Sequence, residues 1–371
     1  MTFRNIHRFA GVRTPGLTVL FAATRRSGIS LILAAFWLCT SAAPSAAQQY
    51  TVTDLGTISG NSVSKASAFN DAGEAAGVSE TPTAAIATTF SGGKATSIST
   101  LGSSVSLANA INNSGEIAGW KSYNSNSNFD PQAFLYSNGS MQNINSPSLF
   151  PSGTEAYGIN NAGEVVGTGY LSPSNFHAFL YSGGKMKDLG PSGAFQATAY
   201  AINTSGQIVG TYSPNSGASG TFLYTNRTMT TLPNPAGSRG GFGVAINDNG
   251  EIVGALYPSS SGGSHAAKFS DGAWTDLGNL TGAQGSGANA INTAGQIVGT
   301  AIFPPTYKPF RAGKHVPFIS TASGLVNLNT LIPSGTGFTL TDAVDINESG
   351  QILCDATNAS GNEHAVLLSP K

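Results

Sequence analysis

The sequence predicts an all-β fold, a seven-bladed β-propeller of four-stranded antiparallel blades, from three observations. A motif of the form A-I-N-x-x-G-x-I-V-G occurs in seven versions, with its asparagine at Asn70, Asn112, Asn160, Asn203, Asn247, Asn292 and Asn347. Successive copies lie 42 to 55 residues apart, and a period in the forties suits one four-stranded blade. Helical pairs share that period, but the density of Gly, β-branched and aromatic residues disfavours helices.

Each repeat is predicted to contain four strands in up-and-down order, as residues 200–232 illustrate. Its first two strands are joined by Asn203-Thr204-Ser205-Gly206, in which Asn and Gly occupy the favoured ends of a type I turn. Its third and fourth strands are residues 221–224 and 229–232. In other repeats the link between these two strands permits the positive φ angles of tight hairpins; examples are Asn138-Gly139, Gly183-Gly184 and Asp271-Gly272.

The seven repeat cores are expected near residues 67–79, 109–120, 157–168, 200–212, 244–256, 289–301 and 344–356. Six of them carry a glycine within the second strand, namely Gly77, Gly119, Gly167, Gly210, Gly254 and Gly299. We expect these glycines to permit close approach of the neighbouring sheet. The seventh core has Cys354 instead, which we expect to be a small buried apolar residue.

The two ends of the repeat region predict how the ring closes. The last copy ends with its third strand at His364–Pro370 and has no fourth strand. Residues Tyr50–Gly56 (YTVTDLG) match the fourth strands at Met186–Gly190 and Trp274–Gly278. We therefore expect the N-terminal strand to complete the last blade, so that no free sheet edge remains between the first and last blades.

Residues 1–47 have the order of a secretory signal peptide: five arginines, the apolar run Ile29–Cys39, and small residues before Gln48. The run is too short for a spanning helix, although an uncleaved anchor is the alternative. Residues 48–371 are then a propeller secreted to the periplasm or the extracellular medium, without membrane insertion and expected to be a monomer. Without residues 1–47, 12 Lys and Arg stand against 18 Asp and Glu, a net charge of −6, which argues against a nucleic-acid partner.

The links after strands two and four emerge at one end of the ring, here called the long-loop end, whereas the other end has only tight turns. Function usually occupies adaptable loops on a rigid scaffold, so we place the binding face at the long-loop end. Aromatic side chains recur just past strand two and are candidate ligand-binding residues: Trp120, Tyr170, Tyr212, Tyr257 and Phe303. They offer rigid area for a sugar or a protein partner, unless they cover the blade tops as core residues.

An insertion in the sixth repeat departs most clearly from the pattern. Between Ala301 and Thr341 it has no acidic residue, and it adds five candidate ligand-binding residues: Tyr307, Lys308, Arg311, Lys314 and His315. On an otherwise acidic chain this basic, aromatic loop would attract an anionic group such as a uronate or a phosphate. The alternative is a solvated loop without a ligand.

No catalytic, metal or cofactor site is predicted. The sequence lacks a G-x-S-x-G elbow, H-E-x-x-H, C-x-x-C and a phosphate-binding loop. A propeller enzyme can still assemble its site from single residues on several blades; Glu155 and Asp342 are candidate acids near the long-loop end, with Arg239 and His315 as basic partners. The other histidines start third strands and cannot converge on the ring axis, so we expect structural hydrogen bonds from His177, His265 and His364.

The repeats resemble the HAF-repeat family of extracellular proteins. The naming triplet stands at His177-Ala178-Phe179, with looser versions at Gln132-Ala133-Phe134 and His364-Ala365-Val366. The asparagine motif and the D-L-G strand also match, over about residues 50–370, and the first and sixth repeats depart most. The resemblance implies secretion and a repeat fold, and it transfers no activity and no site residue.

These observations lead to a secreted binding module that recognises an extracellular glycan or protein through its long-loop face. Two alternatives remain open, a polysaccharide lyase or glycoside hydrolase and a structural surface or matrix protein. No enzyme motif favours the first alternative, so a binding role is the preferred hypothesis.

Overall fold

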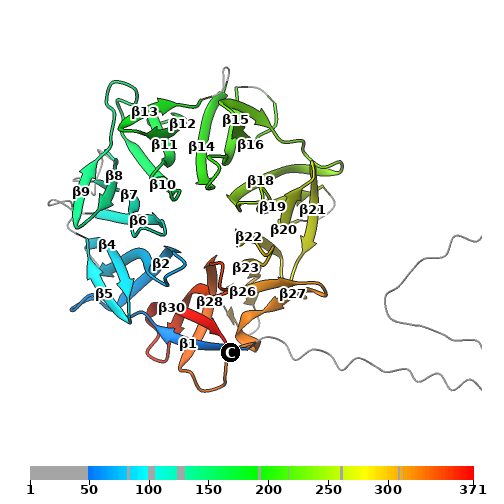
Figure 1. The fold of residues 1–371 in the computed structure, drawn as a ribbon. Coiled ribbons are helices and arrows are strands. Elements are labelled where there is room, and N and C mark those ends of the chain that lie inside the picture. Colours follow the sequence, from blue (N-terminus) through cyan, green and yellow to red (C-terminus); the bar gives the residue numbers. More distant parts are fainter. Residues whose placement is uncertain are drawn as a thin grey trace, which may run out of the picture. The chain divides into compact units, whose positions relative to one another are not determined.

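The computed structural model describes residues 49–371 apart from 82–83, 99–104, 123–129, 191–193, 216, 260–261, 308–309 and 312. The regular structure in this part is β-strand, with one short 3-10 turn, η1 (Leu328–Thr330), so the all-β class is confirmed. Figure 1 shows antiparallel sheets side by side around a common centre, each with one strand nearest to it. The expected secretory segment, residues 1–47, lies outside the described residues. Among those described, no helix has the length and hydrophobicity that crossing a bilayer requires.

The strands follow the repeats along the chain. The first two repeats contain β2 (Val63–Phe69), β3 (Ala75–Thr81), β4 (Ala84–Ser91), β5 (Lys94–Ser97), β6 (Val105–Ile111), β7 (Ile117–Ser122), β8 (Gln132–Ser137) and β9 (Ser140–Asn143). The next two contain β10 (Thr154–Ile159), β11 (Val165–Ser172), β12 (Asn175–Ser182), β13 (Lys185–Asp188), β14 (Ala194–Ile202), β15 (Ile208–Pro214), β16 (Gly220–Thr225) and β17 (Thr228–Thr231). The remaining strands are β18 (Ser238–Ile246), β19 (Ile252–Pro258), β20 (His265–Ser270), β21 (Ala273–Gly278), β22 (Gly285–Ile291), β23 (Ile297–Phe303), β24 (Thr306–Tyr307), β25 (Phe310–Arg311), β26 (Lys314–Thr321), β27 (Gly324–Asn327), β28 (Phe338–Ile346), β29 (Ile352–Asn358), β30 (Glu363–Pro370) and β1 (Tyr50–Asp54).

Strand pairing follows the predicted up-and-down order within each repeat. Three sheets have four strands: β18-β19-β20-β21, β22-β23-β26-β27 and β1-β30-β29-β28. Each of the two eight-stranded sheets consists of two consecutive repeats joined by a single parallel bridge, Ala85 with Val105 or Phe176 with Gln196. The sixth-repeat insertion adds the separate hairpin β24–β25. Not every link at the long-loop end is long, since only two residues join β3 to β4 and β11 to β12.

The strand β1 lies beside β30, the last strand of the chain. The two are antiparallel, and the register runs from Tyr50 opposite Pro370 to Asp54 opposite Val366. Tyr50 is fully buried against Leu328, Leu331 and other residues of the last repeats. The start of the repeat region therefore supplies both an edge strand and a core side chain to the sheet at its end.

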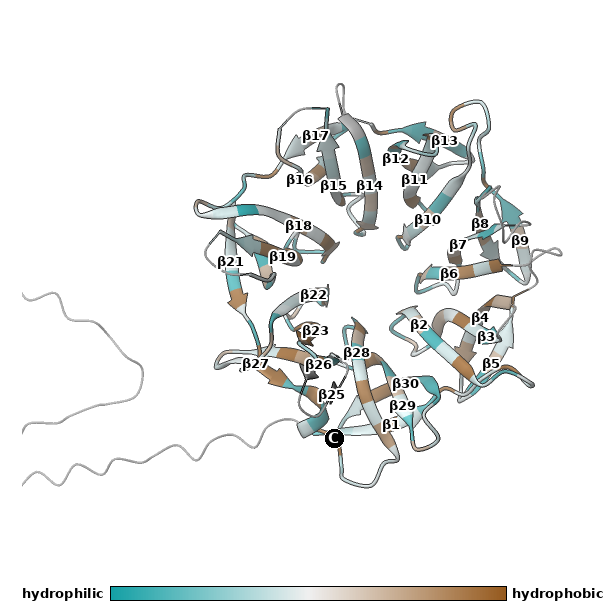
Figure 2. Cartoon of the chain, turned by 180° about the vertical axis from the view of Figure 1, so that it is seen from behind, coloured by the Kyte–Doolittle hydropathy of each residue, from teal (hydrophilic) through white to brown (hydrophobic). Residues whose placement is uncertain are grey.

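The hydrophobic core lies between neighbouring repeats rather than inside any single sheet. One cluster, for example, joins Val166 and Ala178 of the third repeat to Ala199 and Phe222 of the fourth. Fully buried phenylalanines occupy the third strand in five repeats: Phe90, Phe134, Phe179, Phe222 and Phe318. Each such side chain contributes about 1.5–3 kcal/mol by its burial. Figure 2 shows the outermost strands β9 and β13 as hydrophilic, in keeping with their exposure to solvent.

The expectation for the six second-strand glycines was wrong about which neighbour comes close. A Cβ at these positions would lie 1.8 to 2.1 Å from a main-chain oxygen of the first strand in the same sheet, not of the adjacent sheet. The first strand carries a β-bulge beside each glycine, for example between Ala199 and Ala201 opposite Gly210, and this bulge brings its carbonyl inward. In the last repeat, where Cys354 replaces the glycine, β28 has a second register shift between Leu340 and Asp342.

Candidate functional site

The tight turns between the first and second strands carry a circle of hydrogen bonds among the seven repeat asparagines. The Nδ2 of each asparagine donates to the main-chain oxygen of the asparagine in the next repeat, at 3.0 to 3.2 Å from Asn70 onward. Asn347 then donates to the oxygen of Asn70 at 3.4 Å, which returns the chain of bonds to its start. All seven side chains are buried.

The side chain of Asn160 uses all of its hydrogen-bonding positions. Its Oδ1 accepts the N–H groups of Ala162 and Glu164 at 3.1 and 3.0 Å. Its Nδ2 donates to Glu164 Oε2 at 2.9 Å and to the oxygen of Asn203 at 3.2 Å. An amide offers two donors and two acceptors, so the turn N-x-x-G-E satisfies the buried side chain of Asn160 completely. The main-chain bond from Gly163 N–H to Asn160 O, 3.0 Å, has the spacing of the predicted turn.

A polar cavity of about 260 Å³ lies over this circle and is lined by residues of all seven repeats. Its outer edge is bonded between repeats as well. Asp71 accepts the N–H of Glu348 at 3.1 Å and the Nδ2 of Asn113 at 2.7 Å, and Asp248 accepts the N–H of Thr204 at 2.9 Å. Because these polar groups already hold one repeat to the next, we assign the tight-turn end of the repeats a structural role.

The long-loop end carries an aromatic cluster between the third and fourth repeats. We define it as Glu155, Tyr157, Tyr170, Phe176, Tyr200 and Tyr212. The rings of Tyr157 and Tyr200 have centroids 6.0 Å apart, and those of Tyr170 and Phe176 are 5.7 Å apart. Tyr157 and Tyr200 are the extra residues of the bulges in β10 and β14. The bulges therefore aim both side chains away from the regular alternation of their strands.

Glu155 fixes the orientation of two tyrosines of this cluster through hydrogen bonds to its carboxylate. It is only 7% exposed, and its carboxylate accepts hydrogen bonds from the hydroxyls of Tyr157 and Tyr170. Burial raises the pKa of Glu155, and the two phenol donors partly oppose that shift. Burial and the nearby carboxylate raise the pKa of Tyr157 and of Tyr170 in turn. Both phenols thus stay protonated near neutral pH and act as hydrogen-bond donors rather than as proton-abstracting bases.

A small cavity of about 120 Å³ opens next to the cluster. Phe176, Tyr200 and Tyr212 line it together with Gln196, Thr198, Thr211 and Ser213. The described lining combines ring faces with amide and hydroxyl groups and holds no charged side chain. Such a volume is somewhat below the roughly 150 Å³ of a cavity that holds one benzene, so the cavity suits part of one small polar ring rather than an extended chain.

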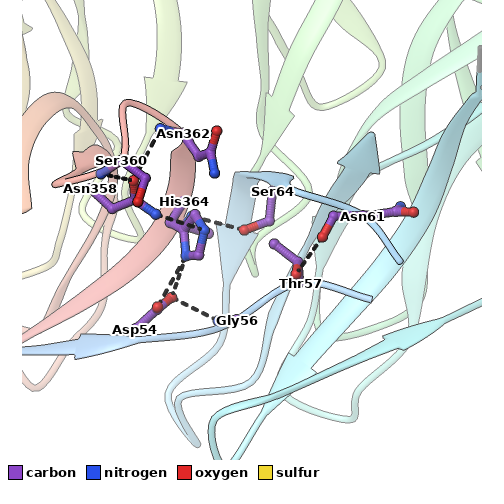
Figure 3. A network of polar contacts seen from close by, with 10 residues as sticks. Asp54, Gly56, Thr57, Asn61, Ser64, Asn358, Ser360, Asn362 and His364 are labelled. Atoms are coloured by element: carbon purple, nitrogen blue, oxygen red, sulfur yellow. Dashed lines mark hydrogen bonds and ion pairs between the residues drawn. The ribbon is translucent and has the colours of Figure 1, made fainter. Parts of the chain in front are cut away.

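Three histidines pair with the aspartate of the D-L-G strand, which confirms their predicted structural role. The Nδ1 atoms of His177, His265 and His364 lie 2.9, 2.8 and 3.0 Å from carboxylate oxygens of Asp188, Asp276 and Asp54, respectively. Each aspartate also accepts the N–H of the glycine two residues later. Figure 3 shows the pair Asp54–His364, which joins β1 to the last repeat. In the described part of the chain, no three His, Cys, Asp or Glu side chains gather as a metal site would require.

The structure places the predicted ligand-binding residues in several groups instead of one pocket. Tyr170 and Tyr212 belong to the aromatic cluster. Tyr257, 40% exposed, packs edge-on against Phe242 with centroids 5.4 Å apart. Trp120 is half-buried in β7.

The basic candidates of the sixth repeat also fall into separate contacts. Lys314 Nζ lies 5.4 Å from the centroid of the Phe303 ring, and His315 Nδ1 lies 3.2 Å from Asp342 Oδ1. The hairpin β24–β25 contains Tyr307 and Arg311. Lys308 lies outside the described residues. The histidine and the aspartate proposed as basic and acidic partners thus meet, at the boundary between the sixth and seventh repeats.

Sequence reasoning missed Tyr157 and Tyr200 as members of a site. Both stand three residues before the repeat asparagine, in Y-G-I-N and Y-A-I-N. The same position holds Ser67, Asn109, Val244, Asn289 and Val344 in the other repeats. Two tyrosines in adjacent repeats at one aligned position were therefore a detectable signal, but the bulge that turns them toward each other was not visible in the sequence.

Comparison with known proteins shows the fold and nothing more specific. No protein-family model and no curated protein matches the chain. Among solved structures, TolB from Acinetobacter baumannii has 14% identity and a TM-score of 0.45, over 80% of this chain and 63% of that one. A prolyl endopeptidase has 8% identity and a TM-score of 0.52, over 87% and 50% of the two chains. The lectin of Aleuria aurantia has 11% identity and a TM-score of 0.37, over 78% and 97%.

The chain spans under two thirds of the length of the first two of these proteins. At such low identity the likeness carries no activity. The chain is an all-β protein of antiparallel sheets with a propeller-like fold.

Proposed function

We propose that residues 48–371 form a closed, seven-bladed β-propeller and that residues 1–47 direct its export to the periplasm or the extracellular medium. Two independent features support closure: β1 pairs with β30, and the asparagine circle returns from Asn347 to Asn70. A closed ring leaves no sheet edge free to pair with another molecule. The net charge of −6 without residues 1–47 and the sparse charged residues suit a surface wetted mainly by Ser, Thr, Asn and Gly.

Deleting residues 49–54 from the exported form is expected to destabilise the protein by several kcal/mol and to promote self-association. The deletion removes β1 and the fully buried Tyr50 side chain, and it leaves β30 as an unpaired edge. Urea unfolding and size-exclusion chromatography measure both effects. A synthetic peptide of residues 49–56, added in excess, should restore stability if β1 acts as the closing strand. Unchanged unfolding after the deletion would rule out closure by β1.

We further propose that the protein is a binding module for a neutral extracellular glycan, held by the aromatic cluster at the long-loop end. The observation that carries this proposal is the set of tyrosines oriented by a buried carboxylate beside a small cavity. Sugars present apolar faces and hydroxyl edges. A lining of ring faces, amides and hydroxyls matches both.

Rigid orientation of the tyrosines favours binding. Glu155 holds Tyr157 and Tyr170, and these rings pack in turn on Tyr200 and Phe176, which line the cavity. Side chains already ordered in the free protein lose little entropy when a ligand arrives, and this preorganisation raises affinity. The absence of charge in the described lining favours a neutral sugar over a uronate.

The size of the cavity favours a glycan over a protein partner. A specific protein interface usually buries roughly 800 Å² on each side, whereas the cluster offers one ring-sized cavity. The protonated phenols also give no support to a lyase that needs a tyrosine base. Recognition of one sugar unit is the simplest use of this geometry.

Replacing Tyr212 by alanine is expected to weaken glycan binding about tenfold. An aromatic contact contributes about 0.5–1.5 kcal/mol beyond its buried area, and 1.4 kcal/mol corresponds to a factor of ten. A glycan array would first identify the ligand, and titration calorimetry would then compare the variants. Tyr257→Ala is the matched control, because it removes an exposed aromatic at the same end but outside the cluster.

The affinity of Tyr257→Ala for the glycan should stay within about twofold of the affinity of the unmodified protein. Equal losses in both variants would place the site elsewhere, and an array without any bound glycan would end the proposal. Glu155→Gln, which keeps the shape but loses acceptor capacity for the two phenols, should show a smaller loss than Tyr212→Ala.

A further inference from the structure

The junction between the last repeat and the first differs chemically from the other junctions, although one contact is common. At several junctions a hydroxyl of one repeat accepts a third-strand N–H of the preceding repeat: Ser106 from Ala87, Thr154 from Ala133 and Ser286 from Ala266. Ser64 accepts the N–H of Ala365 in the same way, at 3.1 Å, where the two ends of the chain meet (Figure 3). The last junction has this shared contact and, in addition, two aspartates that the other junctions lack.

Two aspartates of the last repeat bind the main chain of β2, the first strand of the first repeat. The N–H of Ala66 donates to Asp355 Oδ1 at 2.9 Å, and the N–H of Phe69 donates to Asp345 Oδ2 at 3.1 Å. The other oxygen of Asp345 accepts the N–H of Ile346 at 2.8 Å. Two strands of the last repeat, β28 and β29, thus hold β2 through carboxylates.

Aligned positions in the other six repeats carry no carboxylate. The position of Asp345, two residues before the repeat asparagine, holds Ala68, Ala110, Gly158, Ala201, Ala245 and Ala290. The position of Asp355, just after the second-strand glycine, holds Val78, Trp120, Thr168, Thr211, Ala255 and Thr300. Both aspartates therefore occur only at the junction between the last and the first repeats, where the two ends of the repeat region meet.

The charges around the two aspartates are mostly negative. Asp342 on β28 and Glu363 on β30 act on Asp355, and Asp71, in the turn after β2, acts on Asp345. Lys65 on β2 is the opposing cation, but it already lies 3.3 Å from Glu363 and 3.6 Å from Glu80. His315 lies against Asp342. Ionisation of the two aspartates would therefore add charge to a site that is already acidic.

We propose that the side-chain carboxyl groups of Asp345 and Asp355 form a latch on β2 that holds the ring closed more tightly in mildly acidic than in alkaline solution. The latch rests on the closed ring proposed above and adds a regulated point of opening to it. Opening here would release β2 from β28 and β29, while residues 55–62 still link β2 to β1 of the last sheet. The other junctions lack the latch and should not respond to pH in this way.

The direction of the effect follows from the protonation of the two groups. Burial raises the pKa of Asp345 and of Asp355 to about 7, whereas an opened junction would return each carboxyl toward its ordinary value near 4. A group with a raised folded-state pKa stabilises the closed form below that pKa, and the stabilisation is lost as the pH rises through it. The stability of the junction should thus fall between about pH 4 and 7 and level off above pH 8.

Urea unfolding of the exported chain between pH 5.5 and 8 tests the latch. The unfolding equilibrium constant should rise roughly tenfold or more per carboxylate over this range. Asp355→Asn keeps the side-chain shape and should remove a large part of that rise. Asp271→Asn is the matched control, since it removes one charge at an exposed turn position with positive φ that asparagine tolerates well.

The proposal fails if Asp355→Asn keeps the full pH dependence, or if Asp271→Asn loses as much of it. Hydrogen exchange of the unmodified protein gives a second measurement that needs no variant. After correction for the intrinsic rate, the amides of Ala66 and Phe69 should be better protected at pH 6 than at pH 8. The amides at the aligned positions Ala199 and Ile202 should show no such change. Equal behaviour of both pairs would refute the latch, whereas failure of ring closure itself would appear in the 49–54 deletion.

Discussion

Replacing Asn160 by aspartate is expected to lower the free energy of unfolding by about 3–5 kcal/mol, the usual cost of an uncompensated buried charge. The substitution removes both Nδ2 donors, one to Glu164 and one to the oxygen of Asn203. It also places a second carboxylate where the amide lay 2.9 Å from Glu164 Oε2. Urea unfolding followed by circular dichroism would measure the loss.

Asn203→Asp is the matched control for this prediction. Its partner four residues later is the neutral Gln207, whose Oε1 now accepts from Asn203 Nδ2 at 2.7 Å. The Gln207 amide can rotate and donate to the new carboxylate, so the expected cost is about half as large. Lowering the pH to about 5 should recover part of the loss in Asn160→Asp, because protonation relieves the repulsion between the carboxylates. Equal costs in the two variants at neutral pH would mean that the partner charge does not matter.

Replacing Gly254 by alanine is the second substitution with a large expected effect, about 3 kcal/mol or more. The added Cβ would lie 1.8 Å from the main-chain oxygen of Phe242, and only a shift of β18 away from β19 can relieve that overlap. Overpacking of this kind usually costs about 1–3 kcal/mol, and more where backbone must move. Thermal and urea unfolding would give the magnitude.

Gly262→Ala provides the control for that substitution, because a Cβ at Gly262 meets nothing within 4 Å. Its effect should stay within about 0.5 kcal/mol. If Gly254→Ala were equally mild, the close approach of the two strands would be easily relaxed, and the glycine in this position would need another explanation. The natural occurrence of Cys354 shows that the aligned position of the last repeat accepts a Cβ.

Strand order within the repeats could be predicted because it depends on local patterns. The Asn203–Gly206 turn and the Asp271-Gly272 hairpin are set by residues a few positions apart, and the structure has both. The match of residues 50–56 to the D-L-G strands likewise predicted that they pair with the last strand of the chain, and β1 pairs with β30.

The contacts between repeats could not be predicted in the same way. The pattern N-x-x-G predicts a turn whether or not the asparagine Nδ2 also donates a hydrogen bond to the next repeat. The circle of hydrogen bonds is therefore visible only in the folded structure. The same holds for Glu155, whose hydrogen bonds with the hydroxyls of Tyr157 and Tyr170 become visible only in the folded structure. Asp345 and Asp355, by contrast, are departures from the repeat at aligned positions, and a search for such departures would have found them.

The aromatic candidates show where pattern alone misleads. The aromatic residues that follow strand two were all predicted to belong to one binding face. The bulges and the neighbouring rings give each of them a different environment. Tyr212 lines a cavity, while Tyr257 packs against Phe242 and remains 40% exposed. The environment of each side chain depends on the first strand of its own repeat and, for Tyr212, on Phe176 in the third strand of the preceding repeat, which the sequence of strand two does not contain.

The asparagine circle has a direction, because the side chain of every member donates a hydrogen bond to its successor, and its main-chain oxygen accepts one from its predecessor. A loop of this kind has no terminal member whose loss is harmless. Excising any one repeat would orphan a donor on one flank and an acceptor on the other, and the whole assembly should therefore melt as a single cooperative unit instead of peeling away repeat by repeat.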